Sequence, residues 1–443
     1  MKITDIKARK LLNSKTAWTI ETTITLEDGS FGKASIPGGV SKGKTEVVSH
    51  PANLALQKIE SLKDFLLNKD FRQTSLDSYL LTLDGTNDKS NLGGNVMLSI
   101  SVSFAKAVAM ARNIPLYKHI YQMHYKDVLD NKKLFDPKFE RPEMMMLMLE
   151  GGLHGSNNAS IQEFMAIVNT IDRGIEIYKK IQEELKRLKK STNVGAEGAF
   201  SPDQYDNDQM LTLLAGFLKK ETIALDIAAS SFKETDKIPN YEELLNSYPI
   251  TSIEDPYDEE DWPNWKIFAK KYNKKITVVT DDITTTNPTI LKKAIKENIG
   301  NATIIKPNQI GTLTETLMAT KLAQENGWEV IVSHRGSDTN DDFVADLAIG
   351  INADYVKFGS PARGERVAKY NRLMEIWNEI DSKEALKETS DKLEIMKNDK
   401  CMYIDPVTKK ACGKKSNSIM KIQGENVPLC STHYNVVYRL GLR

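Results

Sequence analysis

The feature that most constrains the fold of this chain is a regular alternation of short apolar segments and amphipathic segments from about residue 142 onward. Amphipathic stretches such as GIEIYKKIQEELKRLKK and TLTETLMATKLAQENG have the apolar spacing of surface helices. The apolar segments have the length of strands and are, in chain order, MMMLML, FMAIV, TIALDIAA, TSIED, ITVVTDD, ATIIKPN, EVIVSHR and DYVKFG. A long β–α alternation predicts parallel strands and, at this length, a closed α/β barrel.

Charged residues follow these strand candidates at their C-terminal ends. The residues in such positions are Asp226, Glu254, Asp281, Lys306, His334 and Lys357. In a barrel, the loops that follow the strands build the active site at this end. A doubly wound open sheet would also gather the C-terminal ends of its strands, so it remains the alternative fold.

Three of these residues are acids that end three separate strands, namely Asp226, Glu254 and Asp281. Converging carboxylates form an oxygen cage suited to Mg²⁺, whose remaining positions go to water or substrate. The alternative is that each carboxylate caps the helix that follows it, as Asp often does. Three strand-end acids followed by a strand-end lysine favour the metal site.

Lys306 and Lys357 end two further strands that we expect to be largely enclosed. Burial and nearby cations depress the pKa of a lysine, which makes the amine a usable base. A single strand-end lysine is more often a solvated surface charge. Two lysines flanking His334 and Arg335 on one barrel face instead indicate an anion site.

The residues before this alternation predict a different, α+β arrangement. The segment WTIETTITLEDGSFGKASI alternates β-branched and polar residues around a turn at Glu27-Asp28-Gly29. A glycine-rich loop follows at residues 37–43, and VMLSISVSFAKAVAMARN predicts a helix whose small residues permit close packing.

Composition limits the classes of protein to which the chain can belong. Its 443 residues are enough for more than one domain. The 60 Lys and Arg residues balance 60 Asp and Glu residues, so no overall charge favours nucleic acid or an anionic membrane. No signal-peptide h-region and no membrane-spanning apolar run is found. We expect a cytoplasmic protein.

All three cysteines lie in the last tenth of the chain, at Cys401, Cys412 and Cys430, and His433 follows the last of them. Three thiolates and one imidazole are the right ligands for a closed tetrahedral Zn²⁺ site, which would supply the folding energy of so short a tail. The alternative is three unrelated reduced cysteines. Five lysines make the tail basic, so nucleic acid binding is conceivable, but a solvated lysine-rich surface is the simpler interpretation.

A series of motifs in the order of one family covers roughly residues 1–380. The motifs are LDGTNDKSNLGGNVMLSISVSFAKA, GGLHGSNNASIQEFM, VGAEGAFSP, IALDIAAS, SIEDPYDEEDW, VTDDITTTNP, IKPNQIGTLTET, VSHRGSDTNDDFVADLAIG and KFGSPARGERVAKYN. In these blocks the chain resembles the enolases. The resemblance implies an α+β capping domain at 1–125 and a modified TIM barrel, starting with antiparallel strands, at 126–385. A linker or terminal helix at 386–400 and a zinc-binding module at 401–443 would follow.

The resemblance also implies how the strand-end residues act. Asp226, Glu254 and Asp281 would hold the first of two Mg²⁺ ions. Lys306 would remove the C2 proton of 2-phosphoglycerate. Lys357 would neutralise the substrate carboxylate as it gains charge.

Other residues receive roles from the same resemblance. Glu197, supported by Glu163, would assist departure of the C3 hydroxyl group, and His334 belongs with them in the catalytic set. Ser41 on the glycine-rich loop would close over the substrate and help to bind the second Mg²⁺. The substrate-binding residues implied are His154, Gln162, Arg335, which would bind the phosphate, Gly336, Ser337 and Ser41.

Some positions depart from the family pattern. The family's GDEGG is GAEGA here, so Ala196 replaces an acid beside Glu197. SHRSG is SHRGS, which moves the phosphate-side serine to Ser337. The family's Glu–Arg pair across a dimer interface would here join Glu21 to Glu375 and repel. We still expect a homodimer.

The function expected from the sequence is that of a glycolytic enolase, a lyase that interconverts 2-phosphoglycerate and phosphoenolpyruvate. The alternative is a weakly active or moonlighting homologue whose zinc tail binds nucleic acid or protein. A scaffold would not need Lys306, Glu197, Glu163 or the carboxylate triplet, so their presence favours the enzyme.

Overall fold

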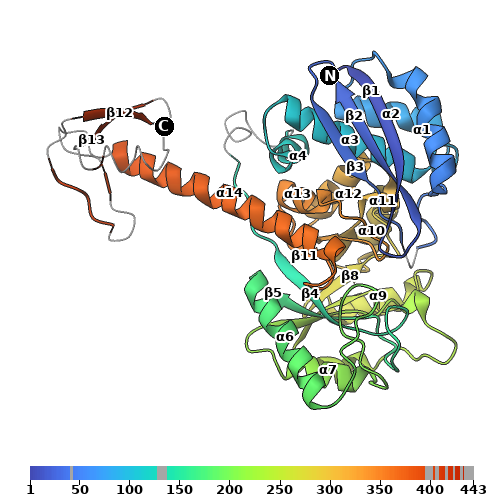
Figure 1. Ribbon diagram of the computed structural model, residues 1–443. Helices are drawn as coiled ribbons and strands as arrows, with labels where there is room; N and C mark the ends of the chain where they lie inside the picture. The colour runs from blue at the N-terminus through green and yellow to red at the C-terminus, as the bar shows by residue number, and fades with distance from the viewer. Residues whose placement is uncertain are drawn as a thin grey trace. The chain divides into compact units, whose positions relative to one another are not determined.

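The computed structural model resolves the chain into two compact units, Met1–Leu373 and Met374–Arg443. Figure 1 shows its helices and strands. The residues that it describes are 1–39, 43–126, 137–394, 403–404, 409–414, 418–422, 425–429 and 433.

The N-terminal part is a three-stranded antiparallel sheet covered by helices (Figure 1). Its strands are β1 (Ile3–Leu12), β2 (Trp18–Leu26) and β3 (Phe31–Ser35), and its helices are α1 (Ala52–Leu66), α2 (Gln73–Asp84), α3 (Gly94–Ala111) and α4 (Leu116–Tyr125). Alternate residues of β2, among them Ile20, Thr22 and Ile24, are buried, which is the burial pattern of a sheet with one face against a core. The predicted hairpin and helix are therefore confirmed.

Helix α3 packs directly against β2 and β3. Gly32 allows this close approach, because a Cβ atom at that position would lie 2.1 Å from the carbonyl oxygen of Ser103. Within the described residues, α3 is the one helix long and apolar enough to cross a membrane, but most of it is buried here. Its apolar character is accounted for by the core of this domain.

The next part is a closed barrel with the strand order β10-β11-β4-β5-β6-β7-β8-β9. The strands are β4 (Glu143–Glu150), β5 (Glu163–Val168), β6 (Thr222–Asp226), β7 (Ile250–Glu254), β8 (Thr277–Thr280), β9 (Ala302–Ile305), β10 (Glu329–Ser333) and β11 (Tyr355–Lys357). Strand β5 is antiparallel to both β4 and β6, and the other pairs are parallel. The predicted modified barrel is confirmed, and the open sheet is excluded.

Inward-facing side chains from most of the strands fill the barrel. This core includes Met145, Leu147, Met165, Ile167, Ala199, Ala224, Val279, Ala302, Ile304 and Ile331. The barrel interior is therefore a packed core, which leaves the ends of the strands as the place for a site.

Helices alternate with the strands of the barrel. They are α6 (Ile171–Arg187), α7 (Asn207–Ala215), the 3₁₀ turn η1 (Ala229–Ser231), α8 (Tyr241–Ser247), α9 (Trp262–Tyr272), α10 (Pro288–Glu297), α11 (Pro307–Ile310), α12 (Leu313–Glu325) and α13 (Phe343–Gly350). Side-chain caps fix several starts; for example, Thr170 accepts the backbone N–H of Arg173 at the start of α6. The last helix, α14 (Gly364–Glu394), runs through residue 385, where the sequence suggests a domain boundary.

The C-terminal unit contains a two-stranded antiparallel sheet, β12 (Ser418–Ile422) and β13 (Glu425–Leu429). Close by in the sequence, the Tyr403 and His433 rings stack with their centroids 3.9 Å apart. The backbone N–H of Cys412 donates to the carbonyl oxygen of Tyr403 over 2.9 Å. Cys401 and Cys430 lie outside the described residues.

Candidate active site

The strand register brings four acids to one end of the barrel. Glu150 is paired with Glu163, Glu163 with Asp226, and Asp226 with Glu254, across the neighbouring strands β4 to β7. Because β5 runs antiparallel, its first residue, Glu163, lies at the same end as the last residues of the other strands. The side chains of adjacent paired residues are about 5 Å apart in a sheet, so these acids form a continuous row.

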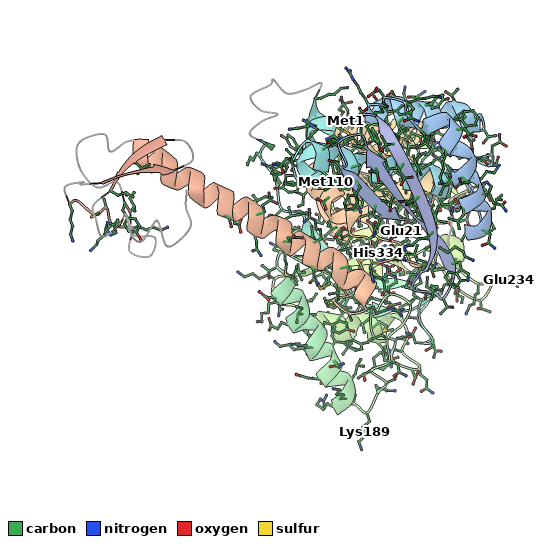
Figure 2. All side chains as sticks on the ribbon, turned by 45° about the horizontal axis from the view of Figure 1, so that its top comes forward. Met1, Glu21, Met110, Lys189, Glu234 and His334 are labelled. Carbon is green, nitrogen blue, oxygen red and sulfur yellow. The ribbon has the colours of Figure 1, made fainter. Side chains whose placement is uncertain are left out.

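A cleft of about 470 Å³, including its open mouth, lies at this end of the barrel. It brings together most of the site residues expected from the sequence: His154, Gln162, Glu163, Glu197, Asp226, Asp281, Lys306, His334, Arg335, Gly336 and Lys357. Figure 2 labels His334 within the unit that contains the barrel. Convergence of residues from β5 to β11 on one cleft is the arrangement of a barrel active site.

Lys357 is held by three carboxylates. Its Nζ lies 2.7 Å from Glu254 Oε2, 3.0 Å from Asp226 Oδ2 and 3.2 Å from Glu163 Oε2. Burial lowers the pKa of this lysine, but the surrounding carboxylates outweigh burial and raise it well above the ordinary value. Lys357 is therefore a fixed positive charge at the base of the cleft.

Lys306 follows β9 and forms an ion pair with Asp281 Oδ2. Asp281 also accepts from Gln309 Nε2 over 2.9 Å. Burial lowers the pKa of Lys306, but the negative charge of Asp281 raises it by more. The pKa of Lys306 therefore lies above the ordinary value. The prediction of a depressed pKa is therefore wrong for both Lys306 and Lys357, because the sequence does not show that carboxylates contact these amines.

The acids at this end fit a divalent cation by their chemistry. Within the described residues, no donor reaches Glu254 Oε1, although this atom is buried. Burial and the neighbouring Asp226 raise the pKa of Glu254 to about 8, which reflects carboxylates held together against their mutual repulsion. Hard oxygen ligands with excess negative charge are what Mg²⁺ requires.

A second group of acids lies beside Asp281. Oxygens of Asp255, Asp281 and Asp282 lie within 4.8 Å of one another, and all three residues are buried. The Asp255 carboxylate accepts the backbone N–H groups of Asp281 at 3.0 Å and Asp282 at 2.9 Å. It therefore fixes the turn that carries Asp281.

Glu197 and His334 form a short hydrogen-bonded pair. His334 Nε2 lies 2.5 Å from Glu197 Oε2, and His334 Nδ1 lies 2.7 Å from the carbonyl oxygen of Lys357. A carbonyl oxygen can only accept, so we assign the Nδ1 proton to the bond with Lys357. A contact this short between Nε2 and a carboxylate oxygen requires one proton between them, which the two groups share.

Burial lowers the pKa of His334 to about 4. Burial raises the pKa of Glu197, but the charges of His334 and Arg366 outweigh burial and hold it well below the ordinary value. His154 Nδ1 lies 3.6 Å from Glu163 Oε1 on the same side.

Arg335 is engaged by a carboxylate that the sequence interpretation did not include. Its Nη2 lies 2.9 and 3.0 Å from the two carboxylate oxygens of Glu46, and Nη1 donates to Asn308 Oδ1 over 3.3 Å. Glu46 follows the glycine-rich loop and lines the cleft. Only its position shortly after that loop could have suggested it from the sequence.

Two of the residues expected to bind substrate require separate comment. Gly336 lines the cleft, but Ser337 is absent from the described lining and pairs its backbone with Gly38, with N···O distances of 2.8 and 3.1 Å. Ser41 lies outside the described residues. Glu150 is a further residue that the sequence interpretation missed, and its signal was the acid that ends the strand MMMLMLE.

The acid expected at a dimer interface, Glu21, is engaged within its own sheet. Its Oε1 accepts from Arg9 Nε over 2.7 Å, and Lys33 Nζ lies 3.9 Å away. Figure 2 labels Glu21 on the N-terminal sheet. The charge of Glu21 is therefore balanced without a partner subunit.

Comparison with known proteins covers the N-terminal sheet domain and the barrel. The family model described as the enolase N-terminal domain matches residues 3–120, and that of the enolase C-terminal TIM barrel domain matches 139–239 and 234–394. The enolase of Ehrlichia ruminantium (strain Welgevonden) is 37% identical over 417 residues, which cover 85% of this chain and 96% of that protein. The enolase of Campylobacter lari is 39% identical over 422 residues, which cover 87% and 98%.

Proposed function

This chain belongs to the enolase family, and we propose that it acts as a phosphopyruvate hydratase, the lyase that interconverts 2-phosphoglycerate and phosphoenolpyruvate. The observation that carries the proposal is the convergence of the buried Lys357, the part-buried Lys306, a row of carboxylates and the Glu197–His334 pair on one cleft. A proton next to a carboxylate is very weakly acidic, so its removal requires concentrated positive charge.

Asp226, Glu254 and Asp281 would hold the first Mg²⁺, and Ser41 would help to hold the second. The metal would supply positive charge for the substrate carboxylate. As a metal ligand, Asp281 would no longer pair with Lys306. Lys306 would then be free to give up its proton and accept the C2 proton of the substrate. The family to which the chain belongs is known for such a pairing of a lysine base with Mg²⁺.

The remaining residues divide the work of the second half of the reaction. Lys357 remains charged and faces the substrate carboxylate. The Glu197–His334 pair would give its shared proton to the departing C3 hydroxyl group, and the short contact between the two residues supports this role. Glu163 would support Glu197, and His154 and Gln162 would line the pocket around them.

Arg335 would bind the substrate phosphate, since a guanidinium group matches a phosphate in charge and geometry. In this structure, the Glu46 carboxylate holds the same guanidinium group. Phosphate binding therefore requires that Arg335 exchange one anion for another. Gly336 follows Arg335 at the edge of the cleft, and Ser337 would need a change in its pairing with Gly38 to reach the phosphate.

The formation of phosphoenolpyruvate from 2-phosphoglycerate, followed in the ultraviolet with and without Mg²⁺, tests this function. We expect Mg²⁺-dependent turnover in the wild type and a loss of at least about 10³-fold in Lys306→Ala. Lys106→Ala is the control, because Lys106 also forms a part-buried ion pair, with Asp341, but lies outside the cleft lining. Unchanged turnover in Lys306→Ala would show that another group is the base.

A finer proposal concerns the tail, where Cys401, Cys412, Cys430 and His433 would bind one structural Zn²⁺. The contacts that join Tyr403 to His433 and to Cys412 support it, because Tyr403 follows Cys401 by two residues. Metal analysis should find about one zinc per chain, lost in Cys430→Ser. A metal-free wild-type protein would rule the site out, and with it a zinc tail that binds nucleic acid or protein.

We also propose a homodimer that works in the cytoplasm as part of glycolysis, without a membrane partner. The family membership supports these assignments. The mass of the particle in solution, measured by sedimentation, tests the dimer. A monomer at micromolar concentration would contradict it.

A further inference from the structure

Glu150 is a buried acid beside the site that has no role in the reaction proposed above. It is the last residue of β4 and lies opposite Glu163 of β5. Its side chain is fully buried, yet it does not belong to the described lining of the cleft. A buried carboxyl group is costly unless its oxygens are hydrogen-bonded, so its partners indicate why it is there.

The partners of Glu150 are backbone groups of the loop that carries Glu197. Its Oε1 accepts from the N–H of Ala199 over 2.7 Å, and both carboxylate oxygens lie 3.0 Å from the N–H of Glu197. Gly195 leaves room for this contact, because a Cβ atom there would lie 2.8 Å from Glu150 Oε2. These hydrogen bonds satisfy the buried carboxyl oxygens and fix two backbone N–H groups of the loop.

The backbone of Glu150 is joined to the same loop. Its N–H donates over 3.0 Å to the carbonyl oxygen of Phe200, the residue that directly follows the loop. The end of β4 is therefore hydrogen-bonded to the loop at Glu197 and Ala199 and to Phe200 after it. The loop carries Ala196 beside Glu197, and the carboxyl group that binds its backbone comes from the end of β4.

Held in this way, the Glu197 backbone directs its side chain toward His334. The 2.5 Å contact between Glu197 Oε2 and His334 Nε2 depends on where that backbone lies. A misplacement of about 1 Å in a catalytic group can cost about 100-fold in rate. We propose that Glu150 is a positioning residue for Glu197. Its carboxyl group holds the loop of residues 195–199 through the backbone N–H groups of Glu197 and Ala199. This inference rests on the proposed function.

Two substitutions separate the geometry of Glu150 from its charge. Glu150→Gln keeps the length of the side chain and one acceptor oxygen, whereas Glu150→Asp keeps the charge but withdraws the oxygens from the loop. Burial and the charge of Glu197 raise the pKa of Glu150 to about 8, so a neutral amide is a fair substitute. Positioning predicts that kcat of Glu150→Gln stays within about tenfold of the wild type, and that Glu150→Asp loses about 100-fold.

The KM for 2-phosphoglycerate should change by less than about threefold in both variants, because Glu150 does not line the cleft. The pH profile of kcat should change in Glu150→Asp, since the proton shared by Glu197 and His334 is displaced, and should be retained in Glu150→Gln. A merely structural role would change neither kcat nor this profile once the protein is folded.

Asp77→Asn is the matched control for loss of stability. Asp77 is also fully buried, and it accepts the backbone N–H of Thr314 over 3.0 Å, but it lies on α2, away from the cleft. We expect it to lower the melting temperature without lowering kcat.

Three outcomes decide the inference. A kcat near that of the wild type in Glu150→Gln, together with a large loss of kcat in Glu150→Asp, supports it. Equal or better turnover in Glu150→Asp than in Glu150→Gln overturns it in favour of a charge requirement, and wild-type turnover in both overturns it in favour of packing alone. If the wild type itself makes no phosphoenolpyruvate, the proposed function has failed instead, and the two failures are distinguishable.

Discussion

At the scale of single residues, the charged side chains of the cleft form ion pairs with one another. Lys357 and Lys306 neutralise the carboxylates, and Glu46 neutralises Arg335. A buried charge without a partner is strongly destabilising, so each of these pairs keeps the cleft compatible with folding. Under the proposed function, substrate and metal would replace partners that are already present, so their binding would be an exchange of ions.

The exchange at Arg335 leads to a prediction for Glu46→Gln. The amide keeps the size of the side chain but removes the charge that competes with phosphate for the guanidinium group. We expect inorganic phosphate to bind about tenfold more tightly, and the KM for 2-phosphoglycerate to fall in the same direction. Titration calorimetry with inorganic phosphate at low ionic strength measures the change.

The control for that experiment is Glu21→Gln, which removes an acid that pairs with Arg9 on the N-terminal sheet. It should leave phosphate affinity unchanged. Unchanged or weaker phosphate binding in Glu46→Gln would mean that Glu46 orients Arg335 for phosphate and does not compete with it.

At the scale of elements, the sequence predicts the strands well and the contacts between loops poorly. Each barrel strand is a local run of apolar residues ended by polar ones, so its position and its catalytic end are visible in the sequence. The pairing of Glu46 with Arg335 joins residues 289 positions apart, and no local pattern encodes it. The raised pKa of Lys306 is missed for the same reason, because it depends on contact with Asp281.

The contact between β3 and α3 gives a prediction at this scale. In Gly32→Ala the new methyl group would lie 2.1 Å from the Ser103 carbonyl oxygen and 2.4 Å from the Ala107 nitrogen, so the helix must move away from the sheet. Overpacking of this kind costs about 1–3 kcal/mol of the free energy of unfolding. Thermal unfolding should show the loss, with kcat of the folded protein unchanged.

Gly216→Ala is the matched control, because Gly216 has the φ of an ordinary helical residue and the nearest atom to a new Cβ lies 3.4 Å away. It should be neutral or slightly stabilising, since Ala restricts the unfolded chain. Equal melting temperatures for Gly32→Ala and the wild type would show that β3 and α3 can separate at little cost.

At the scale of the whole molecule, we expect folding and metal binding to be coupled through the row of acids. The barrel holds Glu254 next to Asp226 in a buried position, and the pKa of Glu254 rises to about 8 as a result. A carboxyl group whose pKa is raised on folding contributes a cost that is absent below its unfolded value near 4.5 and grows as the pH rises toward 8. The raised pKa of Glu254 therefore lowers the free energy of unfolding at neutral and basic pH, at a site whose acids could hold a cation.

The coupling predicts opposite effects of Glu254→Gln in the absence and presence of Mg²⁺. At pH 8 without Mg²⁺, the variant should unfold at a temperature about 2 °C or more above that of the wild type, because the ionisation cost is gone while Asp226 and Glu163 still hold Lys357. Added Mg²⁺ should raise the melting temperature of the wild type and hardly affect the variant, since a ligand that binds only the folded state stabilises it. The exposed Glu242→Gln should behave as the wild type in both conditions. A variant less stable than the wild type at pH 8 without Mg²⁺ would show that the ion pair of Glu254 with Lys357 outweighs the cost of ionising Glu254. The proposed coupling of folding to metal binding would then be wrong.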